Sequence, residues 1–343
     1  MKILAIETSC DETAAAVLQD RNQVLSNVIS SQAAIHAPYG GVVPELASRE
    51  HVRQISPIVK AALNLAETPL DSLDGLAVTQ GPGLIGSLLV GVSFAKTLAY
   101  ALGRPLVSVN HLEGHLFSPL IEYPAIDFPA LGLIVSGGHT SLYWVPRMEE
   151  YELVARTRDD AAGEALDKLA KALGLGYPGG PIIDRLSVRG NPKAFQFSIP
   201  KITAGGLDFS FSGFKTAALR YIREHAIPAA PDQDDVPEQV LDLIASYQSA
   251  IVRTLARRTV VALQQFAARS ILLTGGVACN SLLRSTFKEL FESRGVAVYY
   301  PSPVYTTDNA AMIAAAAAPK LERGQFTDLT LSADANLPLQ SMQ

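Results

Sequence analysis

Two histidines four residues apart are the clearest candidates for chemistry in this sequence. His111 and His115 follow Asn110 and an apolar segment, residues 105–109, that has the composition of a buried strand. If the chain becomes helical at Asn110, a good N-cap residue, the two imidazoles share one helix face and point to one place. Neutral imidazoles arranged in this way are typical ligands of zinc or a transition metal, which usually takes at least a third protein ligand. The pair therefore predicts a metal site.

The third ligand is not expected to be Glu113, the acid inside the motif. Glu113 lies two residues beyond His111, about 200° around a helix, and so faces away from the imidazoles. The zinc-protease pattern H-E-x-x-H has its Glu next to the first His, where this sequence has Leu112. Asp308, at the start of the Ala-rich run 310–318, either caps a helix or completes a His, His, carboxylate site. A histidine pair with a structural role is the alternative to a metal site.

The elements that position these residues must belong to a globular protein. The chain has 343 residues, of which 48% are hydrophobic and 18% charged, enough for two domains with real cores. The formal net charge of −5 gives no global sign of nucleic-acid binding, although phosphate contacts need only a local basic patch. Two distant cysteines provide no disulfide framework and suit a reducing compartment. With no signal-peptide pattern and no apolar run that could span a bilayer, we expect a soluble, cytoplasmic protein.

One order of strands and turns occurs twice in the chain. A strand, a polar turn and a second strand are expected at residues 2–18 and again at 131–145, and a strand, a Gly turn and a helix at 76–102 and again from 271. This weak duplication predicts two similar α/β lobes, whose Gly turns leave backbone amides free to approach a nucleotide. Residues 81–86 match G-x-G-x-x-G, but no acid follows about 20 residues later to hold a ribose, which argues against a dinucleotide site.

A cluster of acids lies between these repeats. Asp160, Glu164 and Asp167 have the i, i+4, i+7 spacing of one helix face, and a Gly/Pro loop with Asp184 just beyond it follows. The cluster is either a solvated acidic face or a set of acids directed at ribose hydroxyls beside the loop. The sequence leaves both interpretations open.

Taken together and in this order, the motifs resemble those of one known family. The matching segments are residues 6–13, 39–49, 111–115, 135–140, 159–164, 177–181, 207–213, 275–277 and 307–309. They resemble the TsaD family of tRNA threonylcarbamoyladenosine transferases, once described as glycoprotein endopeptidases, over nearly the whole chain. The departures are small: Asn110 stands where a further histidine is common, and Cys279 where a small residue is usual.

The resemblance implies an α/β fold of the acetate kinase, Hsp70 and actin (ASKHA) type. Such a fold has two lobes, formed by tandem ribonuclease H-like domains, with a nucleotide cleft. We expect the first lobe at residues 1–110, completed by the C-terminal segment 306–335. The second lobe is then expected at residues 111–305, with an exposed insertion near 226–237, a stretch of linker composition.

The resemblance also implies an activity and its components. The threonylcarbamoyl group of threonylcarbamoyl-AMP is transferred to the N6 amine of adenosine 37 in tRNAs that read ANN codons, with an adenine nucleotide in the cleft. The implied partners are tRNA, a TsaB-like paralogue and a TsaE-like ATPase, with no membrane. One divalent metal is implied per chain, iron(II) being usual and zinc the alternative, with His111, His115 and Asp308 as ligands. The substrate contacts carried over by motif position are Ile134, Val135, Ser136, Gly137, Gly138, Asp167, Gly180, Asp184 and Asn280.

This chemistry is coherent for the residues present. The donor is a mixed anhydride with AMP as a good leaving group, whereas the adenine amine is a weak nucleophile because its lone pair is delocalised into the ring. A metal can polarise the carbamoyl or phosphate oxygens, and the amides of Gly137 and Gly138 can hold developing negative charge. Asp11, at the tip of the first hairpin, is our candidate for positioning the amine or accepting its proton. The rival functions are an ATPase or small-molecule kinase of the same fold, a metallopeptidase, and a nucleotide-binding scaffold.

Overall fold

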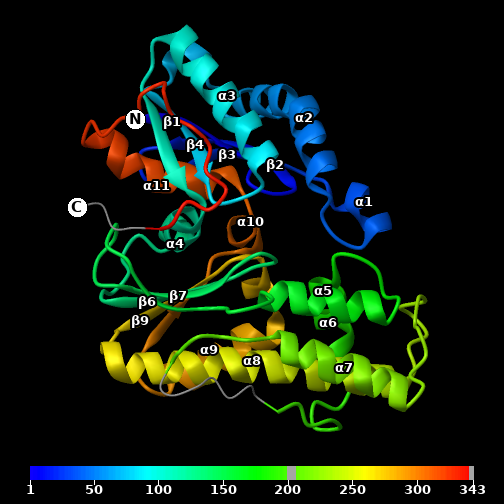
Figure 1. Ribbon diagram of the computed structural model, residues 1–343. Coiled ribbons are helices and arrows are strands. Elements are labelled where there is room, and N and C mark those ends of the chain that lie inside the picture. Colours follow the sequence, from blue (N-terminus) through cyan, green and yellow to red (C-terminus); the bar gives the residue numbers. More distant parts are fainter. Residues whose placement is uncertain (199–205, 340–343) are drawn as a thin grey trace. The chain divides into compact units, whose positions relative to one another are not determined.

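Two five-stranded sheets organise the chain, each in its own compact unit (Figure 1). This computed structural model describes residues 1–198 and 206–339. The first unit consists of Met1–His36, Val42–Ile126 and the chain from Pro301 onward. The second unit consists of Ala37–Gly41 and Asp127–Tyr300. The second unit is therefore largely a continuous segment inserted into the first.

The first sheet has the strand order β3-β2-β1-β4-β5. Its strands are β1 (Lys2–Glu7), β2 (Glu12–Gln19), β3 (Gln23–Ser31), β4 (Gly75–Gly81) and β5 (Leu106–Asn110). The first three form an antiparallel meander, and β4 and β5 continue the sheet parallel to β1. Strands β1, β2 and β4 are almost entirely buried and apolar, as expected for strands covered by helices on both faces.

Helices cover both faces of this sheet. Helices α2 (Pro44–Leu65) and α3 (Ile85–Leu102) pack on the face that carries Leu4 and Ile6. Because side chains alternate along a strand, Ile3, Ala5 and Glu7 point to the opposite face. The Ala-rich α11 (Ala310–Glu322) contacts β1, β2 and β5, and α4 (His111–Glu122) packs against α11.

The remaining elements of the first unit are short. They are α1 (Ala33–His36), η2 (Leu70–Ser72) and α10 (Pro303–Thr306). Helix α3 is long and apolar enough to cross a membrane by length and composition alone. A single such helix is a weak indication, because core helices share these properties, and α3 packs against α2 and β4.

The second sheet repeats the topology of the first, with the order β10-β9-β6-β7-β8. Its strands are β6 (Ala130–Val135), β7 (Thr140–Val145), β8 (Glu152–Arg156), β9 (Ser270–Thr274) and β10 (Ala297–Tyr299). Strands β6, β7 and β8 form the antiparallel meander, and β9 and β10 are added parallel to β6. Since β6 to β10 pair as β1 to β5 do, the predicted duplication is confirmed.

The helices of the second unit enclose one large core. They are η1 (Ala37–Tyr39), α5 (Ala162–Ala172), α6 (Gly179–Ser187), α7 (Ser212–Glu224), α8 (Glu238–Phe266), η3 (Gly276–Cys279) and α9 (Ser281–Glu292). The core is rich in aromatic side chains, and Phe209, Phe211 and Tyr247 in it are fully buried. The hydroxyl group of Tyr247 donates to the carbonyl oxygen of Ala165 at 3.1 Å, which ties α8 to α5.

Two features of the structure concern the expected domain limits and insertion. The first part of unit one continues to Ile126, beyond the expected limit at residue 110. Helix α4 directly follows β5 and packs on α11, so it belongs to the same unit. The stretch 226–237 is exposed at most positions, but Ala230 and Val236 are buried. The Ala230 amide also donates to the Leu173 carbonyl oxygen at 2.8 Å, so this stretch is anchored to the loop after α5.

Candidate functional site

Helix α4 begins as the sequence predicts. Asn110 is its N-cap, and the Asn110 side chain accepts a hydrogen bond from the amide of Leu112 at 2.9 Å. His111 and His115 therefore stand one turn apart on a buried helix face. Asp308 is not the cap of α11, because Asn309 takes that role by accepting from the Met312 amide at 3.0 Å. The carboxylate of Asp308 is left to face the histidines.

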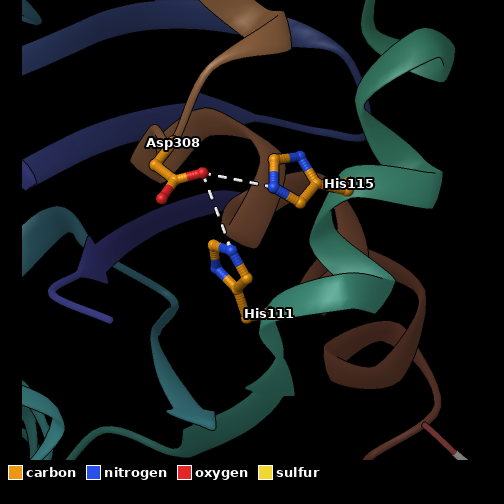
Figure 2. Close-up of side chains that lie close together, drawn as sticks. All are labelled: His111, His115 and Asp308. Carbon is orange, nitrogen blue, oxygen red and sulfur yellow. Dashed lines mark ion pairs between the residues drawn. The ribbon is translucent and has the colours of Figure 1, made fainter. Parts of the chain in front are cut away.

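The three side chains converge, as Figure 2 shows. Oδ1 of Asp308 lies 3.2 Å from Nε2 of His115 and 3.6 Å from Nε2 of His111. The donor atoms of all three residues lie within 4.8 Å of one another. Ligand atoms at about 2.0–2.1 Å from a tetrahedral ion are roughly 3.3 Å apart, so the arrangement fits a first-row divalent metal.

The state of the two imidazoles also fits a cation. His115 is fully buried; within the described residues its Nδ1 has no hydrogen-bond partner, and its Nε2 faces the Asp308 carboxylate at 3.2 Å. Burial lowers the pKa of His115, which keeps it in the neutral form that binds metals. Burial acts in the same direction on His111, but the carboxylates of Asp308 and Glu7 outweigh it and raise the pKa of His111 to about 9. Positive charge is therefore favoured between these carboxylates.

The packing of α4 against α11 sets the position of these ligands. The Glu113 carboxylate faces away from the imidazoles, as predicted, and forms an ion pair with Lys320 of α11 at 2.6 Å. A Cβ atom at Gly114 would lie 2.8 Å from Cδ1 of Ile313, so only glycine permits this close approach without a shift. Since Asp308 lies just before Asn309, the N-cap of α11, the register of the two helices brings it to the histidines.

A buried carboxylate stands behind His111. Glu7 ends β1, is fully buried, and lies with Oε2 3.2 Å from Nδ1 of His111. Glu7 also accepts hydrogen bonds from the amide of Ser9 and from the hydroxyl of Thr79. Sequence reasoning did not select Glu7. Its signal is an acid at the end of an otherwise apolar strand.

The structure places Asp11 in the loop between β1 and β2. Burial and the neighbouring Asp11 carboxylate raise the pKa of Glu12 well above its usual value. The loop is held by His51 of α2, which is fully buried. Nε2 of His51 lies 2.9 Å from the Cys10 carbonyl oxygen, and Nδ1 lies 2.8 Å from the hydroxyl of Thr13. Burial lowers the pKa of His51, so this link is made by a neutral ring.

In the second unit, the end of β6 and the turn after it carry five of the predicted substrate contacts. Ile134 and Val135 are fully buried in the core, and Ser136 is almost so, whereas Gly137 and Gly138 are exposed. A Cβ atom at either glycine would meet nothing within 4 Å, so the turn is open on that side. Ile134 and Val135 therefore position the turn as core residues, and the exposed backbone is the part that can meet a ligand.

The acidic cluster divides between two roles, and Asp160 lies before α5, not on its face, because the helix begins at Ala162. Asp160 and Glu164 form ion pairs with Lys168 at 2.7 and 2.8 Å. Asp167 instead accepts hydrogen bonds from the amides at the start of α6, from Gly179 at 2.7 Å and from Gly180 at 3.3 Å. Asp167 and Gly180 are thus brought together, and the Asp167 carboxylate shapes the Gly/Pro loop.

Asp184 and Asn280 are joined through a residue that sequence reasoning missed. Nε2 of Gln248 donates to Oδ1 of Asp184 at 3.2 Å, and Oε1 of Gln248 accepts from Nδ2 of Asn280 at 3.0 Å. Asp184 also accepts from the amide and the hydroxyl of Ser281. Gln248 is buried in the middle of α8. A polar residue on an otherwise apolar helix face is the sequence feature that could have identified it.

Comparison with protein families gives a match over residues 23–315 to the model described as TsaD: tRNA N6-adenosine threonylcarbamoyltransferase. A protein of that name from Syntrophotalea carbinolica is 50% identical over 339 residues, covering 99% of this chain and 97% of the relative. A second, from Anaeromyxobacter sp. strain Fw109-5, is 51% identical and covers 97% of this chain and 98% of the relative.

Solved structures with the same fold are far more distant in sequence. HypF from T. kodakarensis superposes with a TM-score of 0.61 at 15% identity, over 96% of this chain and 49% of that one. Component A of the (R)-2-hydroxyglutaryl-CoA dehydratase of Acidaminococcus fermentans gives a TM-score of 0.54 at 14% identity, over 94% and 99% of the two chains. With the duplicated sheets, these likenesses confirm the predicted two-sheet ASKHA-type α/β fold.

Proposed function

Because this chain belongs to the TsaD family of tRNA N6-adenosine threonylcarbamoyltransferases, we propose that it performs a metal-dependent transfer of the threonylcarbamoyl group. The donor is threonylcarbamoyl-AMP, and the acceptor is the N6 amine of adenosine 37 in tRNAs that read ANN codons. The observation that supports metal dependence is the convergence of His111, His115 and Asp308, with Nε2 of His115 3.2 Å from Oδ1 of Asp308. We assign iron(II) to this site, with zinc as the alternative.

A divalent ion on these three residues would supply Lewis-acid polarisation of a carbamoyl or phosphate oxygen of the donor. The chain itself supplies binding and orientation. Gly137 and Gly138 are exposed, and we assign the backbone amides of this turn to hold the negative charge that develops on the donor. Asp184 and Asn280, joined through Gln248, form a rigid polar pair suited to nucleotide hydroxyl or amine groups. We assign the adenine nucleotide part of the donor to these turns of the second unit.

Proton transfer is the remaining task of the protein. The attacking amine must lose a proton as its bond to the carbamoyl carbon forms and the bond to AMP breaks. We assign Asp11 to this task, because its carboxylate lies in the β1–β2 loop that His51 fixes to α2. A TsaB-like paralogue and a TsaE-like ATPase are the proposed partners.

The metallopeptidase alternative is disfavoured by the surroundings of Glu113. A peptidase needs a carboxylate within hydrogen-bond reach of a metal-bound water. Glu113, the acid within the motif, is paired with Lys320 on the side of α4 that contacts α11.

Incorporation of labelled threonine into tRNA tests the proposal, with the donor-forming enzyme and partner proteins supplied. We expect His115→Ala to abolish transfer and Asp308→Asn to lower it strongly, because each change removes or weakens a ligand. Asp328→Asn, a change at an acid of the C-terminal segment that bonds to Thr330, is the matched control and should transfer normally. Nucleotide turnover without tRNA labelling would support a kinase or ATPase, and peptide cleavage lost in Glu113→Gln would support a peptidase. Either result would overturn the proposal.

A further inference from the structure

The carboxylate of Glu7 is fully buried in the first unit and lies directly against His111. We propose that Glu7 is a positioning residue that fixes the tautomer and ring orientation of His111 and so prepares Nε2 of that histidine as a metal ligand. This inference rests on the proposed metal site. It assigns a role to a residue that is not itself one of the three ligands.

The hydrogen-bond partners of Glu7 make it an acceptor on every side that the structure shows. The amide of Ser9 donates to Oε1, and the hydroxyl of Thr79 donates to Oε2 at 2.6 Å. A buried carboxylate stabilised by such donors has no proton to give. Its 3.2 Å contact with Nδ1 of His111 is therefore favourable only when Nδ1 carries the hydrogen.

A hydrogen on Nδ1 leaves the lone pair of Nε2 available. Nε2 of His111 is the atom that lies 3.6 Å from Oδ1 of Asp308, on the side of the ring where the proposed ligands meet. The two nitrogens thus have separate tasks, one bound to Glu7 and the other directed to the metal site. Metal-binding histidines are commonly oriented by a carboxylate in this way, and loss of the carboxylate typically costs about 10- to 100-fold in metal affinity.

The hydroxyl of Ser9 is a competing partner, because its Oγ lies 3.1 Å from Nδ1 of His111. If Ser9 donated to Nδ1, the hydrogen of the ring would be on Nε2, and the Glu7 carboxylate would face the lone pair of Nδ1. That arrangement is repulsive between two acceptors and would block Nε2 as a ligand. A hydroxyl can also accept, so Ser9 is compatible with a hydrogen on Nδ1, whereas Glu7 requires it.

Glu7 is also rigid enough to act in this way. It ends β1, whose pairing with β4 is continuous over Ile3–Ile6, and Thr79 follows the last paired residue of β4, Val78. The backbone of two adjacent strands therefore holds the carboxylate and its hydroxyl donor. A buried charge costs several kcal/mol unless it is well paired, and orientation of a ligand is a reason to retain one.

Zinc titration of the metal-free full-length protein, with Zn²⁺ alone as the probe, tests the inference. Glu7→Gln should raise the Kd for Zn²⁺ by about 10- to 100-fold, because the amide can satisfy Ser9 and His111 together only by donating to Nδ1. Ser9→Ala should raise the Kd by less than about threefold, because Ser9 is only a minor partner of His111. Asp74→Asn is the matched control: Asp74 accepts from the Lys2 amide at 2.7 Å at the other end of β1, so zinc affinity should stay at the wild-type value.

A spectroscopic measurement keeps the test independent of folding defects and of activity. In the zinc-loaded wild-type protein labelled with ¹⁵N-histidine, we expect NMR to show the His111 hydrogen on Nδ1 and the metal on Nε2. Metal on Nδ1, or equal zinc affinity in wild type and Glu7→Gln, would overturn the role of Glu7 and leave the metal site itself standing. A large effect of Ser9→Ala with none of Glu7→Gln would do the same. A wild-type chain that binds no zinc or iron would overturn the metal site and this inference together.

Discussion

The ion pair between Glu113 and Lys320 allows a quantitative test of how α4 and α11 are held in register. Its two side chains are 4% and 10% exposed, and the charged atoms are 2.6 Å apart. A pair on the surface would contribute about 0–1 kcal/mol to stability. In this buried setting, Lys320→Met should destabilise the first unit by about 3–5 kcal/mol, because the Glu113 carboxylate would stay buried after losing its ammonium partner.

The double variant Glu113→Leu/Lys320→Met separates charge from shape. Both replacements are apolar and close in volume to the originals, and a buried ion pair replaced in this way is often neutral or even stabilising. We therefore expect the double variant to recover most of the stability that Lys320→Met loses. The difference between single and double variants measures the cost of the uncompensated charge.

Hydrogen-exchange mass spectrometry of peptides from α4 and α11 is the suitable assay. A loss of 3–5 kcal/mol should speed exchange of their protected amides by roughly a hundredfold to a few thousandfold. Trp144 lies in β7, so its fluorescence follows the second unit and should be unchanged. Exchange in Lys320→Met within about threefold of wild type, or a double variant as unstable as the single one, would refute the reasoning.

Three further changes test other parts of the molecule. Gly163→Ala should lower the unfolding temperature of the second unit, because the added methyl group would lie 2.6 Å from the carbonyl oxygen of Ser136; an unchanged Trp144 fluorescence transition would contradict this. His51 should contribute a loss of stability of the first unit as pH falls below about 6.5, because burial lowers the pKa of folded His51 and the unfolded chain then binds a proton at this residue that the folded chain does not. Urea unfolding followed by circular dichroism should show a weaker decrease between pH 7 and 5 in His51→Gln, and parallel curves would exclude His51 as the cause. The affinity for tRNA should fall as salt rises, because binding by a chain of net charge −5 must rest on local phosphate contacts, and a salt-independent Kd would contradict this.

The parts of the site that the sequence revealed depend on local geometry. His111 and His115 were predictable because helical spacing and the Asn110 cap act within a few residues. The same geometry correctly predicted that Glu113 faces away from the two imidazoles, although its partner Lys320 could not be predicted. Such pairs depend on how distant helices pack, which periodicity does not encode.

Contacts set by strand pairing or by long-range packing escaped prediction. Glu7 meets His111 because β1, β4 and β5 are neighbours in the first sheet, a pairing that no local pattern reports. Gln248 contacts Asp184 and Asn280 from the middle of a long helix, and this contact depends on how distant helices pack. The packing of α4 onto α11, which keeps residues 111–126 with the first unit in the structure, likewise depends on distant segments that no local pattern at residue 110 reports.

The insertion of the second unit into the first has a consequence for biosynthesis. His115 leaves the ribosome about 190 residues before Asp308, an interval of roughly 10–40 s at ordinary rates of translation. During that time the second unit, which is nearly continuous, can fold, whereas the first sheet lacks α11 and exposes the apolar residues of β1 and β2 that this helix covers. The apolar face of the nascent first unit therefore stays uncovered, and its two histidines lack their carboxylate, until synthesis is nearly complete.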